Sequence, residues 1–349
     1  MTLATSKALA VGGTPARSLQ HGASDVVIEV ADLNVALKAR GGPVRVVRDL
    51  SFSLRAGARM AILGESGAGK SVTARAISGI LDRRRFAVTG SIQILGREIV
   101  GLSDHQMRAR RGEVGLVFQD PTRTLNPSMR VGTQIAEAIR HVRDVDRAEA
   151  RERAVRLMEQ VGIADPSERA MSYPHQLSGG MRQRIVIAIA LALEPALLLA
   201  DEATTSLDVT TQAQIMKLMR ELTEQRGMTL LVITQDIALA ASSVDEIMVM
   251  YAGRIVEHAP SQELITEPKM PYTRALIASV PGMSGKRQMP QAIAGSPPDP
   301  RQLRDGCPFQ PRCDMAIDRC VLEAPALEVV GAGRLCACWL AQPKGRTEA

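Results

Sequence analysis

The sequence has very few aromatic residues: one Trp, three Tyr and four Phe among 349 residues. Proteins that bind single-stranded nucleic acid by stacking need aromatic platforms, so this scarcity disfavours such a function despite a net charge of +6. The basic residues also lie in scattered clusters, such as "DRRRF" and "RARRG", instead of one stripe. We therefore expect no nucleic-acid partner.

Long apolar runs are also lacking. The longest, residues 185–193, stops at Glu194 and Pro195, well short of the ~18 residues that a membrane-spanning helix needs. Residues 1–25 contain no continuous apolar segment of the signal-peptide type and predict a flexible tail. With 45% hydrophobic and 23% charged residues, the remainder predicts a soluble cytoplasmic protein with a sizeable core.

No cysteine precedes Cys307, so a disulfide framework for the whole fold is excluded and a separate C-terminal module is predicted. The gaps between Cys307, Cys313, Cys320 and Cys338 differ from the C-x₂-C pairs of common zinc modules. Four thiolates from one segment could hold an iron–sulfur cluster. The alternative is a set of reduced thiols packed in a small hydrophobic module. Cys336 is the extra cysteine, although spacing does not exclude it in place of Cys338.

Strands and helices alternate along most of the chain, which predicts an α/β fold with a mainly parallel sheet. Residues 26–54 instead mix alternation with short apolar runs and predict antiparallel strands, and the charged region 131–161 predicts helix. Proline and glycine become frequent after residue 268 and indicate a linker. The predicted organisation is a tail (1–25), a nucleotide-binding domain (26–267) and a cysteine-rich C-terminal module (268–349).

A glycine-rich loop, "GESGAGKS", fits the pattern G-x-x-x-x-G-K-[ST] between a predicted strand and a predicted helix. Its backbone N–H groups can surround phosphate oxygens, Lys70 can reach the β- and γ-phosphates of ATP, and the Ser71 hydroxyl can bind Mg²⁺. A glycine-rich turn without function is the alternative, which the flanking elements weaken. The predicted nucleotide-binding residues here are Gly64, Glu65, Ser66, Gly67, Ala68, Gly69, Lys70 and Ser71.

Two carboxylates end the predicted buried strand "ALLLADE". Asp201 can join the Mg²⁺ shell, and Glu202 can polarise an attacking water. Strands ending in Asp-Glu are common, so this motif gains weight only beside the phosphate loop.

The stretch "LSGGMRQR" places Ser178, Gly179 and Gly180 at a helix start, which suits either an anion site or an ordinary N-cap. "YPHQLSGGMRQR" followed by "LLLADEATTSLD" resembles the signature and second nucleotide motifs of ATP-binding cassette (ABC) transporters, over roughly residues 26–281. The tail segments "PYTRALIASVPG", "GCPFQPRCDMAIDRC" and "CACWL" resemble the importer ATPases for peptides, dipeptides and nickel.

The resemblance implies a phosphate-loop NTPase domain with an antiparallel β subdomain, a helical subdomain and a C-terminal module that holds a [4Fe–4S] cluster on the four cysteines. It implies ATP between two such domains, each phosphate loop facing the other's signature helix. Gln119 would contact Mg²⁺ and couple to the membrane subunits, and Asp208 would touch the opposite subunit. The implied partners are a homologous second ATPase subunit, two membrane permeases and an extracytoplasmic solute-binding protein, with this chain at the cytoplasmic face of the membrane.

Gln235 departs from the family, which has histidine at this strand end. Glutamine can donate a hydrogen bond but cannot carry imidazolium charge or relay a proton. We therefore expect slow hydrolysis at this chain's own phosphate loop and an asymmetric heterodimer; the alternatives are that glutamine suffices, or that the subunit is mainly regulatory. Residues 33–47 also lack the aromatic side chain on which relatives often stack adenine, so aliphatic or arginine contacts are expected to recognise the base.

Overall fold

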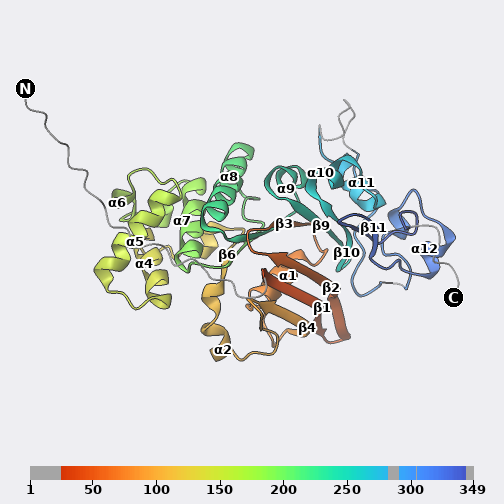
Figure 1. The fold of residues 1–349 in the computed structure, drawn as a ribbon, viewed down its shortest axis with the longest axis horizontal. Coiled ribbons are helices and arrows are strands. Elements are labelled where there is room, and N and C mark those ends of the chain that lie inside the picture. Colours follow the sequence, from red (N-terminus) through yellow and green to blue (C-terminus); the bar gives the residue numbers. More distant parts are fainter. Residues whose placement is uncertain (1–24, 282–290, 304, 343–349) are drawn as a thin grey trace, which may run out of the picture.

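The computed structural model describes residues 25–281, 291–303 and 305–342, so the predicted tail lies almost wholly outside the described residues. A helical region formed by residues 131–192 lies at one end of the molecule and two sheets fill the centre (Figure 1). The C-terminal segment, which comprises the described residues after 267, lies at the other end. No helix in the described residues has the length and apolar character of a membrane span.

The N-terminal strands form an antiparallel sheet with the order β2-β1-β4-β5. Its two longest strands pair antiparallel over most of their length, for example Val35 with Val47, and the apolar residues Val27, Ile28 and Val30 are buried. The antiparallel strands predicted between residues 26 and 54 are therefore confirmed. The sheet contains β1 (Val26–Ala39), β2 (Gly42–Arg55), β4 (Phe86–Ile94) and β5 (Arg97–Glu98).

A second sheet has eight strands in the order β11-β12-β10-β9-β3-β8-β7-β6. Its central strands β9, β3, β8, β7 and β6 are parallel, as the alternation of elements predicts. Every residue of β7 and β8 is buried, which explains their continuous apolar sequences. The strands are β3 (Arg59–Leu63), β6 (Val114–Val117), β7 (Leu197–Asp201), β8 (Thr229–Thr234), β9 (Glu246–Tyr251), β10 (Arg254–Pro260), β11 (Glu328–Gly331) and β12 (Arg334–Cys336).

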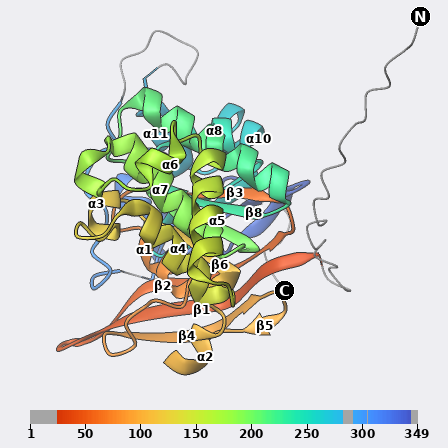
Figure 2. The same cartoon turned by 90° about the vertical axis from the view of Figure 1, so that its left-hand side faces the viewer.

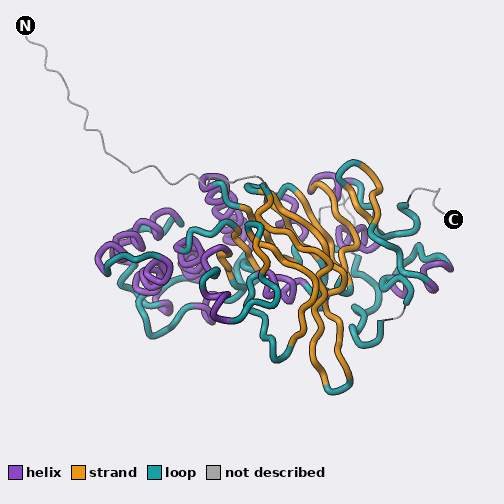
Figure 3. The backbone as a smooth tube through the Cα atoms, turned by 60° about the horizontal axis from the view of Figure 1, so that its bottom comes forward, coloured by secondary structure: helices purple, strands orange, loops and turns teal. Residues whose placement is uncertain are grey.

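Two hydrophobic clusters cover the two faces of the large sheet. Ala61 and Leu63 of β3 belong to the cluster that includes the helical region, whereas Met60 and Ile62 belong to the cluster shared with the antiparallel sheet. Figure 2 shows α4, α5, α6 and α7 together on one side and α2 beside the antiparallel sheet, and Figure 3 shows the strands between helices. The helices are α1 (Lys70–Ile77), α2 (Asp104–Arg108), α3 (Pro121–Thr124), α4 (Val131–Val142), α5 (Arg147–Gln160), α6 (Pro166–Arg169), α7 (Gly179–Ala192), α8 (Val209–Arg226), α9 (Ile237–Ser243), α10 (Ser261–Thr266), α11 (Pro271–Ala278) and α12 (Asp318–Leu322).

The C-terminal segment continues the large sheet, which the sequence analysis does not predict. β12 pairs with β10, and Cys336 lies opposite Glu257. The Glu257 carboxylate is 1% exposed, lies 3.6 Å from Nη2 of Arg334, and accepts hydrogen bonds from the backbone N–H groups of Lys269 and Met270. A buried, hydrogen-bonded carboxylate of this kind fixes the segment firmly against the nucleotide-binding domain.

Candidate nucleotide site

The phosphate loop connects β3 to α1 and needs glycine at particular positions. Gly64 has φ 154°, and an added Cβ would lie 2.3 Å from the Met250 carbonyl oxygen. Gly69 has φ 102°, and its Cβ would lie 2.8 Å from the Val46 carbonyl oxygen. Only glycine fits this conformation and this close approach, so the loop presents backbone N–H groups at the N-terminus of α1.

Lys70 is the first residue of α1 and is only 4% exposed. Its Nζ donates to the carbonyl oxygens of Gly64 at 2.7 Å and Glu65 at 3.0 Å, and lies 4.0 Å from Oε1 of Glu202. Burial lowers the pKa of Lys70, while the neighbouring carboxylate of Glu202 opposes this shift. The ammonium group is thus held directly over the loop.

Two of the three predicted magnesium ligands, Ser71 and Asp201, are in direct contact. Ser71 Oγ donates to Oδ1 of Asp201 at 3.0 Å, although the two residues are 130 positions apart. Asp201 ends β7 and is buried, and this burial raises the pKa of its carboxyl group. A hydroxyl and a carboxylate that converge in this way are the oxygen donors that Mg²⁺ prefers, so these residues fit the ion.

Glu202 and Gln235 follow neighbouring strands. β8 lies between β3 and β7, so Gln235, just beyond its end, emerges between the phosphate loop and the two carboxylates. Glu202 has φ 49° and its N–H donates to the Ile233 carbonyl oxygen at 2.8 Å. A non-glycine residue in the left-handed region is strained, and such strain concentrates at functional sites. The Gln235 side chain is exposed and makes no hydrogen bond to another described residue.

Ser178 and Asp208 cap two helices whose starts lie together at the surface. The Ser178 hydroxyl accepts from the Met181 N–H at 3.3 Å, and Asp208 accepts from the N–H and hydroxyl of Thr211 at 3.0 and 2.7 Å. The starts of α7 and α8 are in close contact, because a Cβ added at Gly180 would lie 2.9 Å from Cγ2 of Thr211. Among the described residues, no hydrogen bond or ion pair joins Ser178, Gly179 or Gly180 to the phosphate loop.

Gln119 lies in the exposed turn after β6. Its carbonyl oxygen accepts a hydrogen bond from the Ser206 hydroxyl at 3.5 Å. This contact connects the turn to the segment between β7 and α8, which carries Glu202 and Asp208. The Gln119 side chain is exposed, and its contact with Mg²⁺ stays a prediction.

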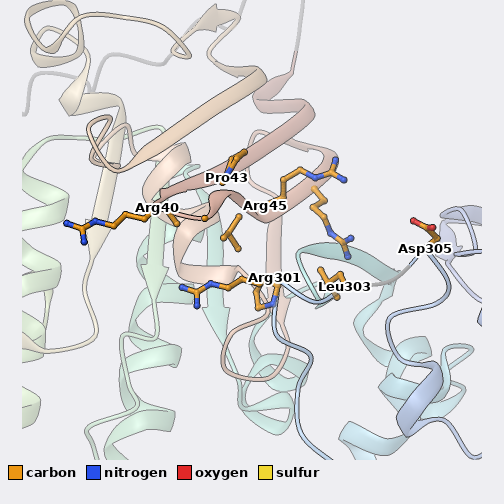
Figure 4. A pocket seen from close by; sticks show the side chains of 12 residues that line it. Arg40, Pro43, Arg45, Arg301, Leu303 and Asp305 are labelled. Atoms are coloured by element: carbon orange, nitrogen blue, oxygen red, sulfur yellow. The ribbon is translucent and has the colours of Figure 1, made fainter.

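A cavity lies beside the β1–β2 hairpin, between residues 39–48 and residues 300–305 (Figure 4). Arginine side chains, including Arg40, Arg45 and Arg301, line it together with aliphatic residues, and none of its lining residues is aromatic. The hairpin also carries Val46, whose carbonyl oxygen faces Gly69 of the phosphate loop. Residues 64–71 of the phosphate loop do not line this cavity, so the expected arginine and aliphatic contacts to a base stay a prediction.

Four cysteines line one small cavity in the C-terminal segment: Cys307, Cys313, Cys320 and Cys338. Burial raises the pKa of the Cys307 thiol to about 11. Cys336 does not line this cavity and is buried on β12. Within residues 25–281, 291–303 and 305–342, no group of three or more His, Cys, Asp or Glu side chains is arranged to hold a single metal ion.

The sequence analysis misses one contact of the phosphate loop. Arg312, from the segment between two of these cysteines, makes an ion pair with Glu65 at 2.7 Å. These residues are 247 positions apart, and neither belongs to a pattern that predicts the other.

Comparisons with known proteins fit this geometry. Residues 47–205 match the family of ABC transporters, and residues 256–320 match the C-terminal region of oligopeptide/dipeptide transporters. The chain is 43% identical to the oligopeptide transport ATP-binding protein OppD of Escherichia coli over 90% of its own length and 94% of that protein. The chain belongs to this family of ABC transporter ATP-binding proteins.

Other relatives are consistent with this membership. The OppD protein of Mycobacterium tuberculosis is 45% identical over 89% of the chain and 51% of that longer protein. Among solved structures, cbiO1 from Clostridium perfringens, part of the ABC transporter complex cbiONQ, has a TM-score of 0.61 and 28% identity, covering 70% of this chain and 92% of that one. A dimeric post-hydrolysis state of the ATP-binding cassette MJ0796, bound to ADP and Pi, has a TM-score of 0.60 at 27% identity, covering 67% and 98%. As a member of this family, the chain is an ATPase coupled to transport, with ATP and Mg²⁺ as cofactors.

Proposed function

We propose that the chain is the peptide-importer subunit that binds and hydrolyses ATP at the cytoplasmic face of a cell membrane. The observation that carries this proposal is the meeting of Ser71 and Asp201 in a chain whose C-terminal region is of the oligopeptide type. The transported solute would be a peptide delivered by an extracytoplasmic binding protein to two membrane permeases. A nickel or glutathione-type solute is the second candidate.

Each predicted site residue has a role in this proposal. Lys70 and the loop N–H groups bind the phosphates, and Ser71, Asp201 and Gln119 would hold Mg²⁺, which neutralises phosphate charge. Glu202 orients and polarises the attacking water. Oε1 of Glu202 lies 4.0 Å from Nζ of Lys70, which supports the assignment of this carboxylate to the phosphate-binding site.

Gln235 makes this chain's own site slow in our proposal. A histidine at the end of β8 would contact the γ-phosphate and hold the water beside Glu202. Glutamine keeps a donor but provides no imidazolium charge at the position where negative charge develops. ATP at this site would then serve mainly as a ligand that holds two subunits together.

The other composite site needs a second ATPase subunit. Ser178 and its neighbouring glycines lie on the surface, away from this chain's own loop, so they can face the nucleotide of a partner. The positive end of the α7 dipole and the free N–H groups there suit a γ-phosphate. A homologous partner with an intact histidine would supply the fast site of an asymmetric heterodimer.

Replacing Lys70 with alanine should weaken ATP binding by the isolated chain on the order of 100-fold, because a charge-assisted contact to the phosphates is lost. Isothermal titration calorimetry measures this directly. Lys217→Ala, which removes an exposed lysine on α8, is the matched control and should bind ATP like the wild type. Equal affinities for all three proteins would contradict the assigned role of the loop.

Uptake into proteoliposomes tests the proposed function. The complex of this chain with its partner subunit and permeases should import a labelled peptide in the presence of ATP and binding protein, and should fail to do so with Lys70→Ala. Uptake of a nickel chelate or glutathione instead of peptides would favour the second candidate. ATP binding without uptake or hydrolysis by any assembled complex would indicate a regulatory subunit.

We also propose that the C-terminal module holds a [4Fe–4S] cluster on Cys307, Cys313, Cys320 and Cys338. The support for this proposal is that all four cysteines line one cavity and that iron–sulfur clusters take four cysteine ligands. Such a cluster would supply a structural crosslink between the turns of this loop-rich segment. No part of the hydrolysis chemistry would depend on it.

The cysteines can be tested one at a time. Anaerobically purified protein should contain iron and acid-labile sulfide, and Cys307→Ser should lose most of both. Cys336→Ser is the matched control, because this cysteine is buried outside the cavity, and it should retain its iron. Iron-free wild-type protein, or equal loss in Cys336→Ser, would contradict the proposed ligand set.

A further inference from the structure

Glu65 of the phosphate loop is held by an arginine from the C-terminal segment. Nη1 and Nη2 of Arg312 donate to Oε2 and Oε1 of Glu65 at 2.7 and 3.0 Å. The Arg312 side chain is only 5% exposed and that of Glu65 is 22% exposed. A bidentate pair with little access to water fixes the orientation of both side chains.

The backbone of Glu65 is held as well. Its N–H donates to the Tyr272 hydroxyl on α11 at 2.8 Å. Arg312 in turn donates from Nη1 to the Tyr251 hydroxyl at 3.2 Å and from Nε to the Ala294 carbonyl oxygen at 2.7 Å. Glu65 is therefore connected on both its main chain and its side chain to residues outside the loop.

A small aromatic cluster supports these hydrogen bonds. The ring centroids of Tyr251 and Tyr272 are 4.5 Å apart, and Phe309 lies 5.4 and 5.3 Å from them. These are three of only eight aromatic residues in the chain. All three are buried, and they join β9, α11 and the segment that carries Cys307 and Cys313. Tightly packed aromatic side chains make a rigid support for the loop.

Arg312 also neutralises the negative charge of Glu65. Glu65 belongs to a loop that is proposed to bind phosphate, and its carbonyl oxygen accepts from Nζ of Lys70 at 3.0 Å. An unpaired carboxylate this close to bound phosphates would repel them. Arg312 neutralises that carboxylate and holds it toward the C-terminal segment, while the loop keeps its phosphate-binding shape.

We propose that Arg312 and Tyr272 are positioning residues through which the C-terminal segment controls ATP affinity at this chain's phosphate loop. The proposal rests on the nucleotide-binding role proposed above for residues 64–71. The new element is that ATP binding by this loop depends on the C-terminal segment, which contains none of the nucleotide motifs. Loss of the contact leaves the loop less ordered and its carboxylate uncompensated, and both effects oppose phosphate binding.

ATP affinities of the full-length chain and its variants test this proposal by calorimetry. Arg312→Ala should bind ATP about 10-fold more weakly than the wild type, which is a typical coupling between sites. Arg312→Lys should lie in between, because lysine keeps the charge but cannot form the fork. Glu65→Gln combined with Arg312→Ala should bind more tightly than Arg312→Ala alone, because the uncompensated charge is gone.

Arg319→Ala is the matched control within the same segment. It removes another arginine ion pair, with Glu323 of the C-terminal segment, and should leave ATP affinity unchanged. Equal weakening by Arg319→Ala and Arg312→Ala, at equal loss of melting temperature, would overturn the proposal in favour of general destabilisation. A double variant that binds no better than Arg312→Ala would also overturn it.

Lys70→Ala separates the two proposals. If Lys70→Ala binds ATP normally, the nucleotide role of the loop itself is wrong. If Lys70→Ala abolishes binding while Arg312→Ala binds like the wild type, the loop binds ATP and only the control by Arg312 is wrong.

Discussion

Replacing Gln235 with histidine is expected to raise the single-turnover rate of ATP hydrolysis at this chain's own phosphate loop by about 100-fold. One transition-state contact in a preorganised site commonly has an effect of this size. The position favours such an effect, because β8 lies between the strands that end at Leu63 and Asp201. The exposed Gln235 side chain leaves room for an imidazole ring.

The measurement needs an assembled heterodimer in which the partner's catalytic carboxylate has been replaced, so that only this chain's loop can hydrolyse ATP. Rapid quench with radiolabelled ATP then reports one site. Gln235→Ala is the matched control and should be as slow as the wild type or slower. A wild-type rate equal to that of Gln235→His would mean that glutamine is an adequate donor and that the site is not degenerate.

Replacing Ser178 with aspartate is expected to reduce steady-state hydrolysis by the assembled complex by 100-fold or more, an effect on the order of that of a lost oxyanion donor. Aspartate is as good an N-cap as serine, so α7 should remain intact. Its negative charge, however, would oppose the γ-phosphate of the partner's nucleotide at the proposed fast site.

Two variants complete this prediction. Ser103→Asp makes the same exchange at the N-cap of α2, where the Ser103 hydroxyl accepts from the Gln106 N–H, and should leave turnover unchanged. Glu202→Gln should reduce steady-state turnover by no more than about twofold, because the site it impairs contributes little. The asymmetric assignment fails if Glu202→Gln is as damaging as Ser178→Asp.

The core of the site could be predicted from the sequence because its signals are local. A short apolar run ending in Asp201 predicts a buried parallel strand, and a strand followed by a glycine loop predicts the phosphate-binding turn. Since parallel strands end at one edge of a sheet, their terminal residues must converge. The contact of Ser71 with Asp201 follows from these rules without any further information.

The C-terminal segment could not be predicted in the same way. β11 and β12 are only four and three residues long, too short for a pattern to be recognised in the sequence, and β12 joins the sheet by pairing with β10. The pair formed by Arg312 and Glu65 depends on packing between distant parts of the chain. Spacing along the sequence contains no information about such a contact.

The role of α7, the helix that follows the signature motif, could not be predicted from one chain alone. Ser178 caps α7 in the monomer, so its local role is an ordinary N-cap, as the sequence also allows. A role in catalysis would require a nucleotide from another subunit. Only its resemblance to a family that acts as dimers led to that proposal.

The most direct test of the asymmetric account is the nucleotide content of the assembled complex after one round of hydrolysis. The complex would be loaded with labelled ATP, triggered with Mg²⁺, quenched after a single turnover, and analysed for bound ATP and ADP. We predict one ATP retained for each ADP formed, with the retained ATP crosslinked to this chain's phosphate loop. Conversion of both nucleotides at similar rates would contradict the account.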